Sequence, residues 1–196
     1  MALWGATDAD ESKPKWMTTA DKKEVLATTA GWVVEAGSTM TGNDNTASTP
    51  EVLVATGNLT TSLGAATIDS VEWITTTADK SAGFTLSARV RYNEAVDVAV
   101  SNPTIAVTNS NAGSGSGRGP HTLTYASGTG SNELVFSLVI AAANAATNAD
   151  DVLSIGAQNV TLASSSTIKD AGTSTNSEVA ISAGQGTAAG TLTVVA

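Results

Sequence analysis

The sequence of 196 residues contains no cysteine, so it forms neither a disulfide framework nor a thiolate metal site. Aromatic residues make up only 4% of the chain and charged residues 14%. This composition argues against a helical bundle, which needs more leucine, glutamate and lysine, and it fits short strands joined by small polar turns. No stretch approaches the roughly 18 consecutive apolar residues that a membrane-spanning helix requires.

Basic residues are also scarce. Nine lysines and arginines stand against 18 acidic residues, which gives a formal net charge of −9. Because an acidic surface repels phosphate, this balance excludes nucleic acids and anionic membranes as expected partners. Residues 1–8 have neither a basic start nor an apolar run, so we expect no secretory signal.

Candidate catalytic groups are few. His121 is the only histidine, and no Gly-x-Ser-x-Gly turn leads from an expected strand into a helix. We expect His121 at the surface or at a strand edge. The glycine-rich residues 113–119 lack the lysine and the following helix of a phosphate-binding loop. The sequence therefore predicts a protein that is not an enzyme and binds no cofactor.

One short acidic segment allows two interpretations. Asn148, Asp150 and Asp151 offer oxygen ligands for calcium, but a complete calcium loop also needs acids at alternating positions and a closing glutamate. Turn formation accounts for the same residues, since Asn and Asp side chains bond to their own backbone. We predict no metal site, with calcium near Asp150 and Asp151 as the open alternative.

Residues 84–92 alternate apolar and polar side chains, and residues 134–140 alternate large and smaller ones. Such a period of two buries one face of a strand and leaves the other face in water. Many short strands of this kind, with turns between them, predict an antiparallel two-sheet β-sandwich over residues 67–196. Residues 109–119 are expected to form an exposed loop. The candidate strands are residues 68–75, 83–92, 104–108, 121–126, 133–140, 152–155, 160–162, 178–181 and 191–195.

Residues 1–66 differ in character and are predicted to form a small N-terminal anchoring module or arm. Up to about residue 20 the chain is expected to be extended, because Pro14 disfavours a helical conformation at the preceding residue, Lys13. A short helix is expected over residues 20–30, capped by Thr19. Residues 32–34 and 52–55 suggest strands separated by a polar loop, and residues 57–66 suggest a linker.

Three of the four tryptophans lie in this first part, together with four of the nine basic residues. Tryptophan is costly to leave in water and is enriched among interface anchors, so we expect this part to bind a partner. Two alternatives stay open: the tryptophans pack within their own module, or Trp32 packs internally while Trp4 and Trp16 dock. The predicted partner-binding residues are Trp4, Lys13, Pro14, Lys15, Trp16 and Trp32.

The second part resembles bacterial Ig-like domains, which occur in large bacterial surface proteins and in phage structural proteins. The resemblance covers roughly residues 68–182 and implies an Ig-like antiparallel β-sandwich, without specifying a function. The motifs that carry it are RVRYNEAV at residues 89–96, PTI at 103–105, LTYASGTGSNELVF at 123–136 and TIKDAG at 167–172.

The first part is similar to the start of virion structural proteins of marine tailed phages. The motifs are MALWG at residues 1–5, KPKW at 13–16, AGWVVEAG at 30–37 and PEVLVA at 50–55. This resemblance implies a capsid decoration or cement protein, made in the host cytoplasm and located in the virion. Its expected partners are the major capsid protein, other virion subunits and further copies of itself. The alternatives are a neck, tail or fibre protein, or an Ig-like adhesin that binds host-surface glycans.

Overall fold

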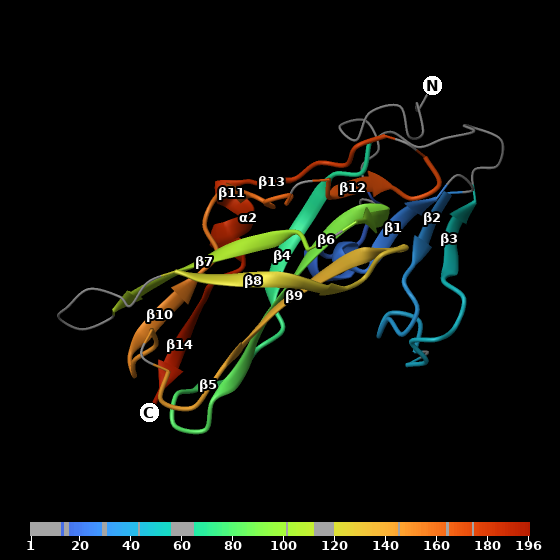
Figure 1. Ribbon diagram of the computed structural model, residues 1–196. Coiled ribbons are helices and arrows are strands. Elements are labelled where there is room, and N and C mark those ends of the chain that lie inside the picture. Colours follow the sequence, from blue (N-terminus) through green and yellow to red (C-terminus); the bar gives the residue numbers. More distant parts are fainter. Residues whose placement is uncertain are drawn as a thin grey trace.

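A computed structural model of the protein describes residues 13, 16–28, 31–42, 44–55, 65–100, 102–111, 120–144, 146–163, 165–173 and 175–196. The fold is mainly β: among the described residues there are fourteen strands and two short helices (Figure 1). None of the described helices has the length and apolarity needed to cross a membrane.

The described part of residues 1–66 folds as a small three-stranded sheet, which we call the N-terminal module. Its elements are α1 (Thr19–Lys23), β1 (Val25–Thr28), β2 (Gly31–Val34) and β3 (Glu51–Ala55). The sheet order is β1-β2-β3, and both pairs are antiparallel. This module has a small hydrophobic core of its own. The core consists of Met17, Val25, Trp32 and Val34, with Ala27, Met40 and Leu53 packed against it.

The prediction of a helix over residues 20–30 is confirmed only for residues 20–23. The helix ends at Lys23, and it is capped by Thr18, whose hydroxyl accepts a hydrogen bond from the Asp21 amide at 3.2 Å. Val25 and Leu26 follow in β1, because pairing with β2 buries both side chains there. Residues 16–20 form a turn and the start of this helix, not an extended arm.

The second part forms one curled nine-stranded sheet. Its hydrogen-bonded order is β12-β6-β9-β8-β7-β10-β14-β5, with β4 paired to β6 off this path. A two-stranded sheet, β11 (Gln158–Asn159) with β13 (Ala180–Ile181), and helix α2 (Ala183–Ala188) complete it. The strands of the large sheet are β4 (Ile68–Trp73), β5 (Ala78–Asp79), β6 (Phe84–Ala99), β7 (Thr104–Asn111), β8 (His121–Ser127), β9 (Ser131–Ile140), β10 (Asp151–Ser154), β12 (Thr167–Asp170) and β14 (Thr191–Val195).

Several strand predictions need adjustment. Residues 160–162 are not a strand, since only Thr161 makes an isolated bridge, with Thr104. The strands β5, β11 and β12 and the helix α2 were not expected from the sequence. β7 continues through Asn111 into the segment expected to be a loop, and residues 112–119 lie outside the described part, as do residues 57–64 of the expected linker.

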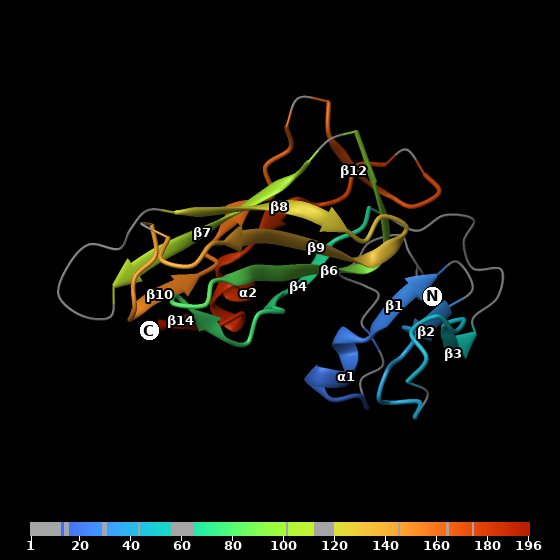
Figure 2. The same cartoon turned by 60° about the horizontal axis from the view of Figure 1, so that its bottom comes forward.

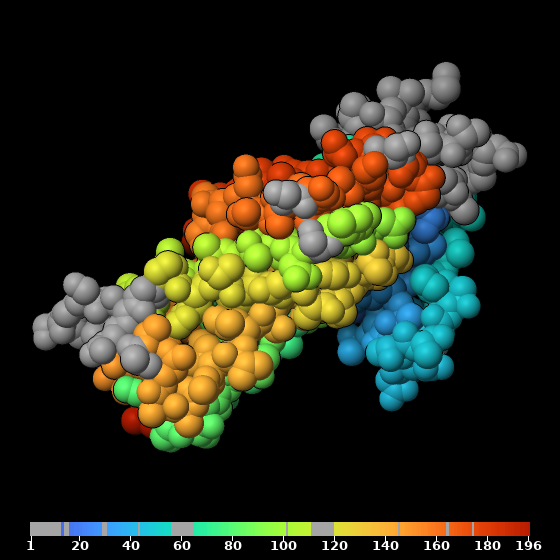
Figure 3. Space-filling view, viewed as in Figure 1, coloured from blue at the N-terminus to red at the C-terminus, as the bar shows by residue number. Residues whose placement is uncertain are grey.

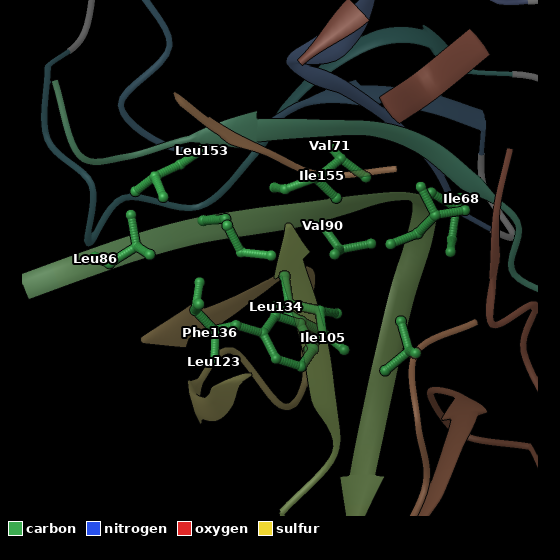
Figure 4. Packing of buried hydrophobic residues seen from close by; sticks show 14 of the residues in the cluster. Ile68, Val71, Leu86, Val90, Ile105, Leu123, Leu134, Phe136, Leu153 and Ile155 are labelled. Carbon is green, nitrogen blue, oxygen red and sulfur yellow. The ribbon is translucent and has the colours of Figure 1, made fainter. Parts of the chain in front are cut away.

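The large sheet curls around the main hydrophobic core. The alternating pattern predicted that one face of each strand is buried, and β6 and β9 confirm this. Leu86, Ala88 and Val90 of β6 are fully buried, as are Leu134 and Phe136 of β9. Figure 4 shows these side chains converging with others from β4, β7 and β8. The Phe136 ring also meets the Tyr125 ring edge-on, with 6.1 Å between centroids.

The turn between β8 and β9 depends on a glycine. Gly128 has φ +117°, and a Cβ at this position would lie 1.8 Å from the carbonyl oxygen of Glu133. Gly172 has φ +82°, but no described atom lies within 4 Å of the place of its Cβ. An alanine at Gly172 would meet only the strain of a positive φ. An alanine at Gly128 would meet this strain and also a steric clash with the β9 backbone.

We expect Gly172→Ala to lower the free energy of unfolding by about 1 kcal/mol, since only the positive φ is penalised. Gly128→Ala should cost about 3 kcal/mol or more, because the β8–β9 backbone must also move apart. Urea unfolding of both variants measures the difference. Equal losses would contradict the role assigned to the close approach at Gly128.

Candidate functional site

The N-terminal module is joined to the large sheet by charged side chains on β6. β1 lies against β6, and Figure 2 shows α1 and β1–β3 gathered beside one end of the large sheet. The Arg91 side chain is only 6% exposed. Its Nη1 donates to the Lys23 carbonyl oxygen at 2.7 Å and to Glu35 Oε1 at 3.1 Å, so one guanidinium bonds two segments of the module.

The same guanidinium also contacts carboxylates of the large sheet. Arg91 Nη2 lies 2.6 Å from Glu133 Oε1, and Arg91 Nε lies 3.7 Å from Glu72 Oε2. Arg89 lies 3.3 Å from each of Glu72 and Glu133, and Lys23 pairs with Glu72. Three cations and three carboxylates therefore balance. We call this set the junction cluster: Lys23, Glu35, Glu72, Arg89, Arg91 and Glu133.

Strand register explains why these side chains meet. Alternation along β6 sends Ala88 and Val90 into the core and Arg89 and Arg91 to the outer face. In the antiparallel ladders Glu72 of β4 pairs with Arg89, and Glu133 of β9 pairs with Arg91. The large sheet alone therefore makes opposite charges cross-strand neighbours, and the module contributes Lys23 and Glu35 to the same cluster.

Two of the three glutamates of the junction cluster have pKa values shifted in opposite directions. Burial raises the pKa of Glu35, and the nearby Arg91 charge only partly offsets this. Burial also opposes ionisation of Glu72, but the hydrogen bond and charge of Lys23, with the charges of Arg91 and Arg89, hold its pKa below the usual value. Glu72 is therefore the firmly ionised member, and Glu35 is the weaker acid.

A second ion pair joins the module to β4. Lys13 Nζ lies 2.6 Å from Asp69 Oδ2 and donates to the Lys22 carbonyl oxygen at 2.6 Å. Burial lowers the pKa of Lys13, although the charge of Asp69 opposes this shift. Lys13 thus serves within its own chain, at the same junction.

A cleft of about 610 Å³ opens beside the junction cluster. Its walls come from both parts of the chain: Glu24, Leu26 and Glu35 from the module, and Arg89, Arg91 and Asn132 from the large sheet are among them. The arginines in its wall already hold carboxylates at ion-pair distance. The geometry is that of a charged contact between the N-terminal module and the large sheet.

The tryptophans predicted to bind a partner have different surroundings. Trp16 is 72% exposed, whereas Trp32 is 5% exposed and belongs to the core of the N-terminal module. Trp32 therefore follows the alternative of internal packing. Trp4, Pro14 and Lys15 lie outside the described residues.

His121 begins β8, but it is buried, so the surface position expected for it is wrong. Its Nε2 lies 3.3 Å from Thr147 Oγ1. Burial lowers the pKa of His121, against the opposing charge of Asp151. His121 is therefore an interior position, next to the buried Thr147.

The segment considered for calcium forms a turn. Asp151 is fully buried, and its Oδ2 accepts hydrogen bonds from Asn109 Nδ2 at 2.9 Å and from the Asn148 amide at 2.8 Å. Asp150 has φ +65°, a turn conformation that Asp tolerates. Within the described ranges, no group of three or more His, Cys, Asp and Glu side chains is placed to hold a metal ion.

Comparison with protein-family models, with curated proteins and with solved structures found no match to this chain.

The junction cluster predicts unequal effects of its two arginines. Arg91→Met leaves Glu35 without its cation and Glu133 with Arg89 alone, so we expect a loss of about 3 kcal/mol in unfolding free energy. Arg89→Met is the matched control on the same face of β6, where the side chain is 32% exposed, and should cost about 1 kcal/mol. Hydrogen exchange should show β1 and β2 losing protection first in Arg91→Met; uniform loss over both parts would contradict the junction role.

Glu35 and Glu72 predict opposite pH dependences. Glu35 has a raised pKa in the folded chain, so the free energy of unfolding falls as pH rises above the ordinary glutamate pKa of about 4.3; Glu35→Gln lacks this loss and should gain on the wild type above that pH. Glu72 has a lowered pKa, so its contribution is present above that value and is lost as pH falls; Glu72→Gln should be most harmful at neutral pH. Urea unfolding at several pH values measures both slopes, and slopes of the same sign would refute the assignment.

Proposed function

We propose that this protein is a non-enzymatic structural component of a phage virion, a decoration or cement protein on the capsid surface. In this proposal the N-terminal module docks on the assembled shell and the second part, an Ig-like domain, projects outward. The observation that carries the proposal is the exposed indole of Trp16 on a module fixed by the junction cluster.

An exposed tryptophan suits a docking contact. The indole of Trp16 is a large apolar surface, and its burial against a neighbour gains about 2 kcal/mol or more. Met17, the next residue, is 5% exposed and packs in the module core. The backbone next to Trp16 is thereby anchored, so little conformational entropy is lost when the indole docks.

The junction cluster supports the same proposal. A module that moved freely on a linker would lose orientational freedom each time it docked. Here Arg91 ties Lys23 and Glu35 to β6, and Lys13 ties the module to Asp69. In this proposal the large sheet therefore keeps a fixed orientation relative to the docking surface of the module.

We expect Trp16→Ala to weaken binding to capsids that lack this chain by at least about tenfold, because the buried indole is lost. Val139→Ala is the matched control: this side chain is 76% exposed but lies on β9 of the large sheet. Co-sedimentation of each purified variant with such capsids measures the binding. Unchanged binding of Trp16→Ala, with wild-type stability, would count against docking through the module.

The copy number in purified particles decides where the protein sits. A decoration protein should occur in a fixed, high ratio to the major capsid protein, because it repeats over the shell lattice. A neck or tail protein should occur at the low copy number of one ring. Quantitative mass spectrometry gives the ratio, and the absence of the chain from purified virions would contradict the proposal.

A further inference from the structure

Residues 141–150 connect β9 with β10 at the surface of the protein. This connection lies at the end of the large sheet that is remote from the N-terminal module, which is blue in Figure 3 (Figures 1 and 3). Among its described residues only Thr147 is buried, and the others are partly or fully exposed. Thr147 is therefore the side chain by which the connection is inserted into the protein interior.

Thr147 lies against the only histidine of the chain. Its Oγ1 is 3.3 Å from Nε2 of His121, and both residues are buried. His121 is the first residue of β8 and shares the inner face of this strand with Leu123, which belongs to the main core. The inserted hydroxyl of the connection therefore contacts an imidazole that is shielded from water.

The other contacts that hold the connection are polar as well. Asn109 Nδ2 donates to the Ala146 carbonyl oxygen at 3.1 Å, and the Asn148 amide donates to Asp151 Oδ2 at 2.8 Å. Lys80 Nζ donates to Asn148 Oδ1 at 3.3 Å. No apolar side chain is buried in the described part of the connection. Polar contacts therefore hold it in place, and Lys80 already brings one positive charge beside it.

The surroundings of His121 favour the uncharged imidazole. On β7 the residue paired with His121 is Val107, which is fully buried. On β9, residues 137–140 lie at this end of the sheet and carry no charge. The carboxylate of Asp151 on β10 favours the protonated imidazole, but burial outweighs this charge and holds the pKa of His121 below 6.5.

We propose that protonation of His121 releases the connection between β9 and β10 from the large sheet. The uncharged imidazole accommodates Thr147 at neutral pH, whereas a charged imidazole gains hydration when Thr147 moves away. Because the closed form binds the proton more weakly than the open form, it loses stability as pH falls below 6.5. One proton is involved, so the equilibrium constant for opening rises by up to about tenfold per pH unit.

Amide hydrogen exchange at about pH 7 and about pH 5 tests the proposal. The amides of Thr147 and Asp150 report on the connection, because they donate to the carbonyl oxygens of Asn144 and Val194. We expect their protection factors, which correct for the intrinsic pH dependence of exchange, to fall at least about threefold at the lower pH. His121→Gln stays uncharged and should show no such fall. Equal falls in both proteins, or none in the wild type, would overturn the proposal.

Titration of the imidazole itself is a second measurement, and it needs no variant. Because His121 is the only histidine, the imidazole signals in NMR spectra of the wild type belong to it. We expect a midpoint below 6.5, with the signals of Thr147 changing over the same pH range. A midpoint at or above 6.5 would show that Asp151 stabilises the charged imidazole in the closed form, and this result would also overturn the proposal.

Discussion

The burial of Arg91 is the constraint on which the arrangement of the two parts depends. A guanidinium that is 6% exposed needs acceptors and counter-charges close by, since an unpaired buried charge costs several kcal/mol. The large sheet supplies Glu133, but the Lys23 carbonyl and Glu35 come from the N-terminal module. The module that covers Arg91 therefore also brings acceptors that the buried guanidinium needs.

This constraint comes from one strand that serves two purposes. The inner face of β6 supplies Leu86, Ala88 and Val90 to the main core, while its outer face presents Arg89 and Arg91. A shift of one residue in register would exchange the two faces and place both arginines in an apolar interior. Packing of the core and seating of the module are thus coupled through the pleat of β6.

The sequence predicted those elements whose burial follows a simple period. The alternation at residues 84–92 and 134–140 indicated β6 and β9, because one face of each meets an apolar core. The helix expected beyond Lys23 failed because pairing of Val25 with Val34 outweighs local propensity. The junction cluster was missed: the alternation put Arg89 and Arg91 on one face, but the approach of Glu35, 56 residues from Arg91, is a tertiary event.

The module holds the surface to which we assign docking, the exposed indole of Trp16. One such contact is small and does not by itself give a tight complex. The junction cluster matters here, because the ion pairs of Arg91 and Lys13 already fix the module on the large sheet. The two parts then dock as one body, and no orientational freedom between them is lost on binding.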